Sequence, residues 1–136
     1  MSNSMLDDVR ILLVDDEPEM LDMLEQFLGD CGARVTIVHS ARAALAAIVA
    51  DPPDVLVSDI CMPGEDGYWL IRGVRALPCD GGGAVAAIAM TGDVVTNSPS
   101  RIRHAGFDEV RGKPFDLEDL ADLIVRLVAA DARCRT

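Results

Sequence analysis

Residues 55–67 read Val-Leu-Val-Ser-Asp-Ile-Cys-Met-Pro-Gly-Glu-Asp-Gly, a segment that changes abruptly from apolar to polar. An apolar run ends in the carboxylate of Asp59, and the Met-Pro-Gly segment that follows can continue neither a strand nor a helix. The pattern predicts a buried parallel strand over Val55 to Ser58, with Asp59 at the carboxyl edge of a sheet. Because open α/β folds bind their ligands at that edge, we predict that Asp59 is the reactive residue.

The segments on either side of this stretch alternate between strand and helix patterns. Mainly apolar runs predict strands at 9–14, 35–38, 55–58 and 85–90, and a fifth strand is predicted at 107–111. Helical spacing predicts helices, counted with their capping residues, at about 18–30, 40–50, 66–77, 99–105 and 116–128. Residues 79–83 read as a flexible loop. Five β–α units in strict alternation predict an α/β fold with a parallel sheet and helices on both faces.

Length and composition narrow the class of protein. The 136 residues predict one domain over 9–131, with a flexible N-terminus at 1–8 and a tail at 132–136. Twelve basic and 23 acidic residues give a formal net charge of −11, which argues against nucleic acid as a partner. No apolar run approaches the roughly 18 residues that a membrane span requires. The four cysteines are scattered as reduced thiols usually are, so we expect a cytoplasmic protein.

Five side chains of matched chemistry follow or end the predicted strands, namely Asp15, Asp16, Asp59, Thr91 and Lys113. Considered one at a time, an acidic residue after a strand is commonly a helix cap, and a threonine at the end of a strand is commonly a turn residue. The carboxyl ends of parallel strands meet at one edge, however, so we expect these five groups to converge. Clustered carboxylates repel one another, and Mg²⁺ would relieve that conflict. A carboxylate beside Mg²⁺, an ammonium and a hydroxyl is suited to attack phosphorus and form an aspartyl phosphate.

These residues resemble the receiver domain of bacterial two-component response regulators, of the chemotaxis-regulator type. The likeness spans about Arg10 to Val128 and rests on Asp15-Asp16, Asp59-x-x-Met62-Pro63-x-x-x-Gly67, Thr91-Gly92 and Lys113-Pro114-Phe115. It implies a flavodoxin-like (βα)5 sandwich with strand order 2-1-3-4-5. The sequence around Asp59 is also similar to that of receivers fused to hybrid sensor kinases. The resemblance therefore fits both a stand-alone protein and a domain excised from a longer one.

The resemblance implies a role for each acidic residue of the set. Asp59 would accept a phosphoryl group from a histidine kinase or a histidine phosphotransfer protein. Asp16 would bind Mg²⁺ directly and Asp15 largely through water, with Asp59 and the backbone carbonyl of Cys61 as further ligands.

The same resemblance implies roles for residues around the acids. Thr91 would move toward the phosphoryl group, and Lys113 would pair with it. Gly92, being small, would leave access to the acyl phosphate, and the peptide bond before Pro114 would be cis.

Two positions depart from the commonest family pattern. The family often carries Tyr or Phe three residues before the lysine, where this chain has Val110. A signal transmitted by rotation of an aromatic ring is therefore in doubt, and movement of the loop after Thr91 and of the helix at 99–105 is favoured. Asp93 places an additional acid two residues after Thr91, and we predict that it modulates autodephosphorylation.

The leading hypothesis is a phosphorylation-controlled switch rather than an enzyme with turnover. Its output would be binding to a downstream protein through the face formed by 99–105, 107–111 and 117–128, with a homodimer as one arrangement. A phosphohydrolase would typically have a second acid where this chain has Cys61. A phosphate-independent interaction scaffold with the same fold is the alternative that Val110 keeps open.

Overall fold

The computed structural model describes residues 5–93, 95–113 and 116–130. The strands are β1 (Arg10–Val14), β2 (Arg34–Val38), β3 (Val55–Asp59), β4 (Ala86–Thr91) and β5 (Glu109–Gly112). The helices are α1 (Pro18–Asp30), α2 (Ala41–Ala50), α3 (Gly67–Arg75), α4 (Pro99–Ala105) and α5 (Leu117–Ala130). Every predicted element is therefore present, and its ends differ from the prediction by no more than about two residues.

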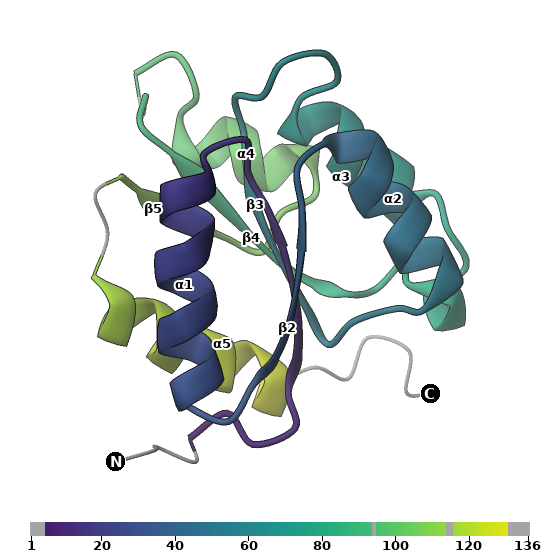
Figure 1. The fold of residues 1–136 in the computed structure, drawn as a ribbon. Helices are drawn as coiled ribbons and strands as arrows, with labels where there is room; N and C mark the ends of the chain where they lie inside the picture. The colour runs from purple at the N-terminus through teal and green to yellow at the C-terminus, as the bar shows by residue number, and fades with distance from the viewer. Residues whose placement is uncertain (1–4, 94, 114–115, 131–136) are drawn as a thin grey trace.

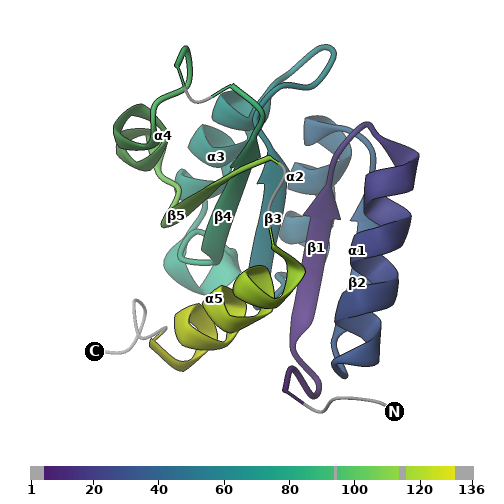
Figure 2. The same cartoon turned by 90° about the vertical axis from the view of Figure 1, so that its left-hand side faces the viewer.

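The strands form one parallel sheet in the order β2-β1-β3-β4-β5, which confirms the predicted topology (Figure 1 shows the fold, and Figure 2 labels all five strands). Helices α1 and α5 cover one face of the sheet, and α2, α3 and α4 cover the other (Figure 2). All carboxyl ends of the strands consequently lie along one edge, where ligands of such folds bind.

Each face of the sheet has its own hydrophobic core. Because side chains alternate along a strand, β1 places Leu12 and Val14 in the core under α2, α3 and α4. Its Ile11 and Leu13 belong to the core under α1 and α5. Strand β3 is buried at every position, as expected for the centre of a parallel sheet. The central strand is thus held on both sides, and Asp59 at its end has a rigid support.

The side-chain caps that the sequence predicts fix where α2, α3 and α5 begin. Ser40 Oγ accepts from the N–H of the third residue of α2 at 3.1 Å, and Asp66 Oδ1 accepts from the Trp69 N–H at 2.9 Å. Asp116 Oδ1 accepts from the Glu118 N–H at 2.8 Å. These bonds satisfy amides that the first helical turn leaves unpaired, as the sequence pattern predicted.

Two segments are more ordered than predicted. Leu6, which falls in the N-terminus predicted to be flexible, is fully buried, and its N–H donates to the Cys31 carbonyl at 2.8 Å. Cys79–Gly81 forms a 3₁₀ turn in the loop predicted to be flexible, and the Gly83 N–H donates to Pro78 O at 2.9 Å.

The cysteines differ in oxidation state. Cys31 and Cys61 are free thiols, as expected. Cys79, by contrast, is disulfide-bonded, so the expectation of four reduced thiols is wrong. Cys79 is exposed in the loop after α3, whereas Cys31 is buried in the core under α1 and α5.

Arg75, the last residue of α3, joins the far end of the sheet to the loops around it. Its Nη2 lies 3.2 Å from Asp108 Oδ2. Its guanidinium also donates to three backbone carbonyls, those of Gly83 (3.0 Å), Val85 (2.6 Å) and Gly106 (2.9 Å). One half-buried side chain thus ties together the segments that enter β4 and β5.

Strands β2 and β5 form the two edges of the sheet. Arg34 and Thr36 of β2 are exposed, and Arg34 Nη2 lies 3.2 Å from Asp8 Oδ1.

Among the residues that the structure describes, no helix combines the length and the apolar character needed to cross a bilayer.

Candidate functional site

The predicted site residues lie at the carboxyl edge of the sheet. Asp59 and Thr91 are the last residues of β3 and β4, Asp15 follows β1, and Lys113 follows β5. Strands β1 and β3 are neighbours, with Val14 in register with Ser58, so Asp15 and Asp59 leave the sheet side by side.

Three carboxylates gather at this edge. Oxygens of Asp15, Asp16 and Asp59 all lie within 4.8 Å of one another. Asp15 and Asp59 are buried, with Asp59 only 5% exposed, whereas Asp16 faces solvent. Carboxylate oxygens at this spacing, with one side open to water, are the ligands that Mg²⁺ prefers, so the donor set fits a hard divalent cation.

Lys113 supplies the positive charge of the cluster. Its Nζ lies 3.2 Å from Asp15 Oδ2 and 3.3 Å from Asp59 Oδ2, and the side chain is 15% exposed. Burial alone would lower the pKa of Lys113, but Asp59 and Asp15 raise it above its usual value. Three ionised carboxylates and one ammonium give the cluster a net charge of −2. A divalent cation would neutralise this charge.

Asp59 is harder to ionise than an ordinary aspartate. Burial and the neighbouring Asp15 carboxylate raise the pKa of Asp59 to about 6, although Lys113 and the Cys61 N–H act in the opposite direction. The Cys61 N–H donates to Asp59 Oδ1 at 3.4 Å, so the residues after β3 also orient the carboxylate.

Gly67 brings α3 against the end of β3. A Cβ atom at Gly67 would lie 2.7 Å from the Asp59 carbonyl oxygen and 2.9 Å from Ile60 Cα, closer than side chains allow. The Gly67 N–H donates to Ile60 O at 2.9 Å. The glycine of the motif therefore permits the close approach that closes the β3–α3 loop beside Asp59.

Thr91 is at the predicted edge, but its hydroxyl is bonded to its own loop. Thr91 Oγ1 donates to the Asp93 carbonyl at 3.2 Å and accepts from the Asp93 N–H at 3.0 Å. The structure thus brings Asp15, Asp16, Asp59 and Lys113 together, and it leaves Thr91 engaged elsewhere.

The predicted modulating positions lie around this cluster. Asp93 Oδ1 accepts from the N–H groups of Val95 (3.1 Å) and Thr96 (3.0 Å), and these bonds lower the pKa of Asp93, the Thr96 bond most. Gly92 is exposed, and a Cβ there would meet only open space. Val110 is buried in the core under α3 and α4. Pro114 lies outside the described residues.

Sequence reasoning missed a buried polar pair beside the site. Tyr68 Oη donates to Asn97 Oδ1 at 3.0 Å, and both side chains are buried. Asn97 lies in a run of helix-breaking residues and reads as a turn, while Tyr68 at a helix start reads as packing. Only their separation of 29 residues in sequence hides the contact, because no local pattern joins them.

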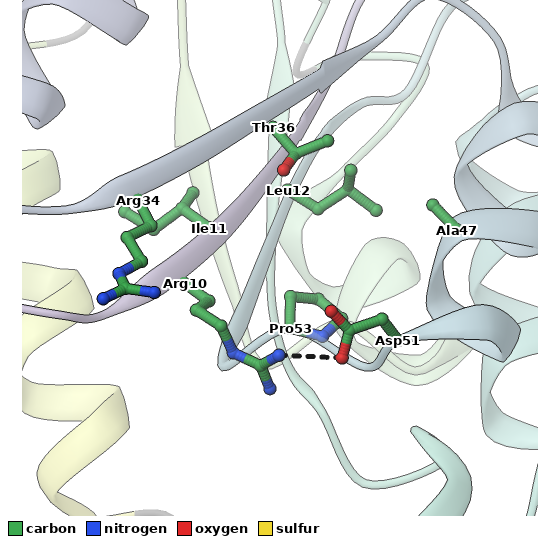
Figure 3. Close-up of a pocket in the computed structure, with 8 residues that line it drawn as sticks. All are labelled: Arg10, Ile11, Leu12, Arg34, Thr36, Ala47, Asp51 and Pro53. Atoms are coloured by element: carbon green, nitrogen blue, oxygen red, sulfur yellow. Dashed lines mark hydrogen bonds and ion pairs between the residues drawn. The ribbon is translucent and has the colours of Figure 1, made fainter.

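A cavity of about 360 Å³ lies at the opposite end of the sheet, between β2 and α2 (Figure 3). Arg10, the first residue of β1, reaches Asp51 Oδ1 at 2.8 Å across it. Because the cavity lies at the amino ends of the strands, it contains none of the predicted site residues.

Comparison with known proteins agrees with this geometry. The family model for the response regulator receiver domain matches residues 11–125. An uncharacterized 14.6 kDa protein of Leptolyngbya boryana is 39% identical over 114 residues, which are 84% of this chain and 86% of that protein. The sensor histidine kinase GacS of Pseudomonas protegens is 31% identical over 118 residues, which are 86% of this chain but 13% of the kinase.

Solved structures share the fold. The receiver domain of sensor histidine kinase PA1611 from Pseudomonas aeruginosa, whose structure has a magnesium ion in its active-site cleft, superposes with a TM-score of 0.83. It is 28% identical, and the match covers 90% of this chain and 99% of that domain. Since the family match spans most of the sequence and the strand order is the one that the family implies, the chain belongs to the response regulator receiver domains.

Proposed function

We propose that this receiver domain accepts a phosphoryl group on Asp59 in a Mg²⁺-dependent reaction and thereby changes what it binds. The observation that carries the proposal is the position of Lys113, whose ammonium lies within 3.3 Å of both Asp15 and Asp59. An ammonium held between two carboxylates at a sheet edge can pair with phosphoryl oxygens as the transfer proceeds.

The residues divide the chemistry between them. An Asp59 carboxylate oxygen forms the new bond to phosphorus as the bond from phosphorus to the leaving group of the donor breaks, which gives an acyl phosphate. Asp15, Asp16 and Asp59 would hold Mg²⁺, with the Cys61 carbonyl as a further expected ligand. Bound Mg²⁺ supplies positive charge that offsets the charge of the phosphoryl oxygens. Lys113 donates to one of those oxygens, and Thr91 would donate to another.

The protonation state suits a nucleophile near neutral pH. With a pKa of about 6, Asp59 is mostly ionised at pH 7 even in the absence of a metal ion. A bound cation favours the carboxylate further, because it replaces the repulsion by Asp15 with attraction.

The proposal also covers the binding partners of the domain and its location in the cell. A histidine kinase or a histidine phosphotransfer protein would donate the phosphoryl group, and a downstream protein, or a second copy of the chain, would bind the face of α4, β5 and α5. The domain would act in the cytoplasm without nucleic acid or membrane, and it would catalyse only its own phosphorylation and dephosphorylation.

A phosphate-independent scaffold is the second candidate. Two observations favour it: Val110 offers no aromatic ring, and the Thr91 hydroxyl is bonded to Asp93. Uptake of phosphate separates the two candidates.

Incubation with acetyl phosphate and Mg²⁺ is expected to add the mass of one phosphoryl group to the intact protein, as measured by mass spectrometry. Removal of Mg²⁺ by a chelator is expected to prevent the gain, because the carboxylates then repel the donor. No mass gain would favour the scaffold, and continued hydrolysis of phosphomonoesters would favour a phosphohydrolase.

Replacement of Lys113 by methionine is expected to tighten Mg²⁺ binding about tenfold, because the three carboxylates lose the one ammonium that partly neutralises them. Isothermal titration calorimetry measures the affinity. Exchange of Arg72, an exposed cation on α3, for methionine is the control and should leave the affinity unchanged. Weaker binding in Lys113→Met would contradict the expectation that this ammonium opposes the bound cation.

A further inference from the structure

A buried hydrogen bond connects α3 to the loop between β4 and α4. Tyr68 Oη donates to Asn97 Oδ1 at 3.0 Å, with Tyr68 8% and Asn97 6% exposed. Without water to replace it, each polar group depends on its protein partner. The bond therefore favours one position of the loop relative to α3.

The same loop holds the Thr91 hydroxyl. The carbonyl of Asp93 accepts both from Thr91 Oγ1 and from the Asn97 N–H, each at 3.2 Å. The Asp93 carboxylate in turn accepts from the Val95 and Thr96 N–H groups. Thr91 and Asn97 are thus opposite ends of one hydrogen-bonded unit, and a displacement of either end disturbs the other.

Two further contacts fix this unit to its surroundings. Arg101 places its guanidinium carbon 4.7 Å from the centre of the Tyr68 ring, and its Nη1 donates to Thr96 O at 3.1 Å. Asn97 Nδ2 donates to Cys61 Sγ at 3.7 Å, which links the loop to the residues that follow Asp59.

We propose that Tyr68 and Asn97 are positioning residues that hold the Thr91 hydroxyl on Asp93 until the domain is phosphorylated. This inference rests on the proposed function, because Thr91 must reach a phosphoryl group on Asp59. Movement of the loop would carry Asp93 away from the hydroxyl, and the Tyr68–Asn97 bond opposes that movement. Val110 on the neighbouring strand has no polar group that could do so.

Exchange of Tyr68 for phenylalanine tests the hydroxyl alone, because the ring that faces Arg101 is kept. We expect phosphorylation by acetyl phosphate and Mg²⁺ to become about fivefold faster, the factor that loss of one ordinary hydrogen bond gives. Ser100→Ala, which removes an exposed hydroxyl from α4, is the control and should keep the original rate. An unchanged or slower rate in Tyr68→Phe would overturn the inference.

A double-mutant cycle with Thr91→Ala separates positioning from general loosening. If Tyr68 acts through the Thr91 hydroxyl, the fivefold gain disappears when that hydroxyl is absent. A gain of the same size in the Thr91→Ala background would contradict the proposed route.

Hydrogen exchange tests the loop without a phosphodonor. The Val95 and Thr96 amides are expected to exchange about fivefold faster in Tyr68→Phe, while the amide of Leu123 in α5 keeps its rate. Unchanged exchange at both loop amides would overturn this inference alone. Absence of any mass gain in the original protein would instead overturn the proposed function, so the two failures are distinguishable.

Discussion

Asparagine in place of Asp59 is expected to abolish the mass gain with acetyl phosphate and Mg²⁺. The amide has the size of the carboxylate but cannot form an acyl phosphate, and the two remaining site acids do not take its place. The Asp15 side chain has no exposed surface, whereas that of Asp59 is 7% exposed, so we expect a phosphodonor to reach Asp59 rather than Asp15. Intact mass spectrometry over the same time course measures the effect.

The same variant should be more stable than the original protein at pH 7 without Mg²⁺, by about 1–2 kcal/mol. The pKa of Asp59 is raised from 3.8 to about 6 in the folded state, so the folded protein binds the proton more tightly than the unfolded chain. Stability therefore falls as the pH rises from about 4 to about 6, and the asparagine variant avoids that loss. Urea denaturation at pH 3 and pH 7 measures it, and the difference should vanish at pH 3, below both pKa values.

Asp22→Asn is the matched control for both measurements, since Asp22 is exposed on α1. It should keep both the mass gain and the original stability. Phosphate uptake by Asp59→Asn would show that another residue is the acceptor. A loss of stability at pH 7 would show that the folded protein does not disfavour the ionised Asp59 carboxylate.

Methionine in place of Arg75 is expected to destabilise the fold by about 3 kcal/mol, measured by urea denaturation. The substitution keeps much of the apolar length but removes the donors to three backbone carbonyls and the cation beside Asp108. Asp108 Oδ2 also accepts from the Ala87 N–H at 2.8 Å, so loss of the cation leaves a half-buried negative charge against the start of β4.

The control for Arg75 is Arg72→Met, on the same helix but exposed. Its effect should stay within about 0.5 kcal/mol, as is usual for surface substitutions. A similar effect of both substitutions would mean that the contacts of Arg75 add little to stability. The variant should still take up phosphate below its unfolding transition, because Arg75 lies away from Asp59.

The fold could be predicted because its signals are local. Mainly apolar runs of four to six residues mark the first four strands, and caps such as Ser40 and Asp66 mark helix starts one to three residues away. Placement of Asp15, Asp59 and Lys113 at one edge then follows from parallel topology alone, which is why their proximity was predictable without a contact map.

The rest depends on contacts that no local pattern encodes. The Tyr68–Asn97 bond and the contacts of Arg75 join residues 8 to 33 positions apart, and each partner has a common local role that conceals the contact. The Thr91 hydroxyl is a different case, because its bonds to Asp93 are local. The strand pattern predicts where this hydroxyl lies but not which partner it takes.

The open edge at β2 has a consequence for the handling of the protein. An unpaired strand exposes a row of backbone donors and acceptors on which another chain can grow, the first step toward a fibril. In this protein the β2 edge also bears the Arg34 side chain, and each chain has a formal net charge of −11. Two negatively charged chains repel each other before their β2 edges come within hydrogen-bonding distance. We therefore expect concentrated samples to resist fibril growth at low salt. This resistance should weaken as the ionic strength rises, because salt screens the repulsion.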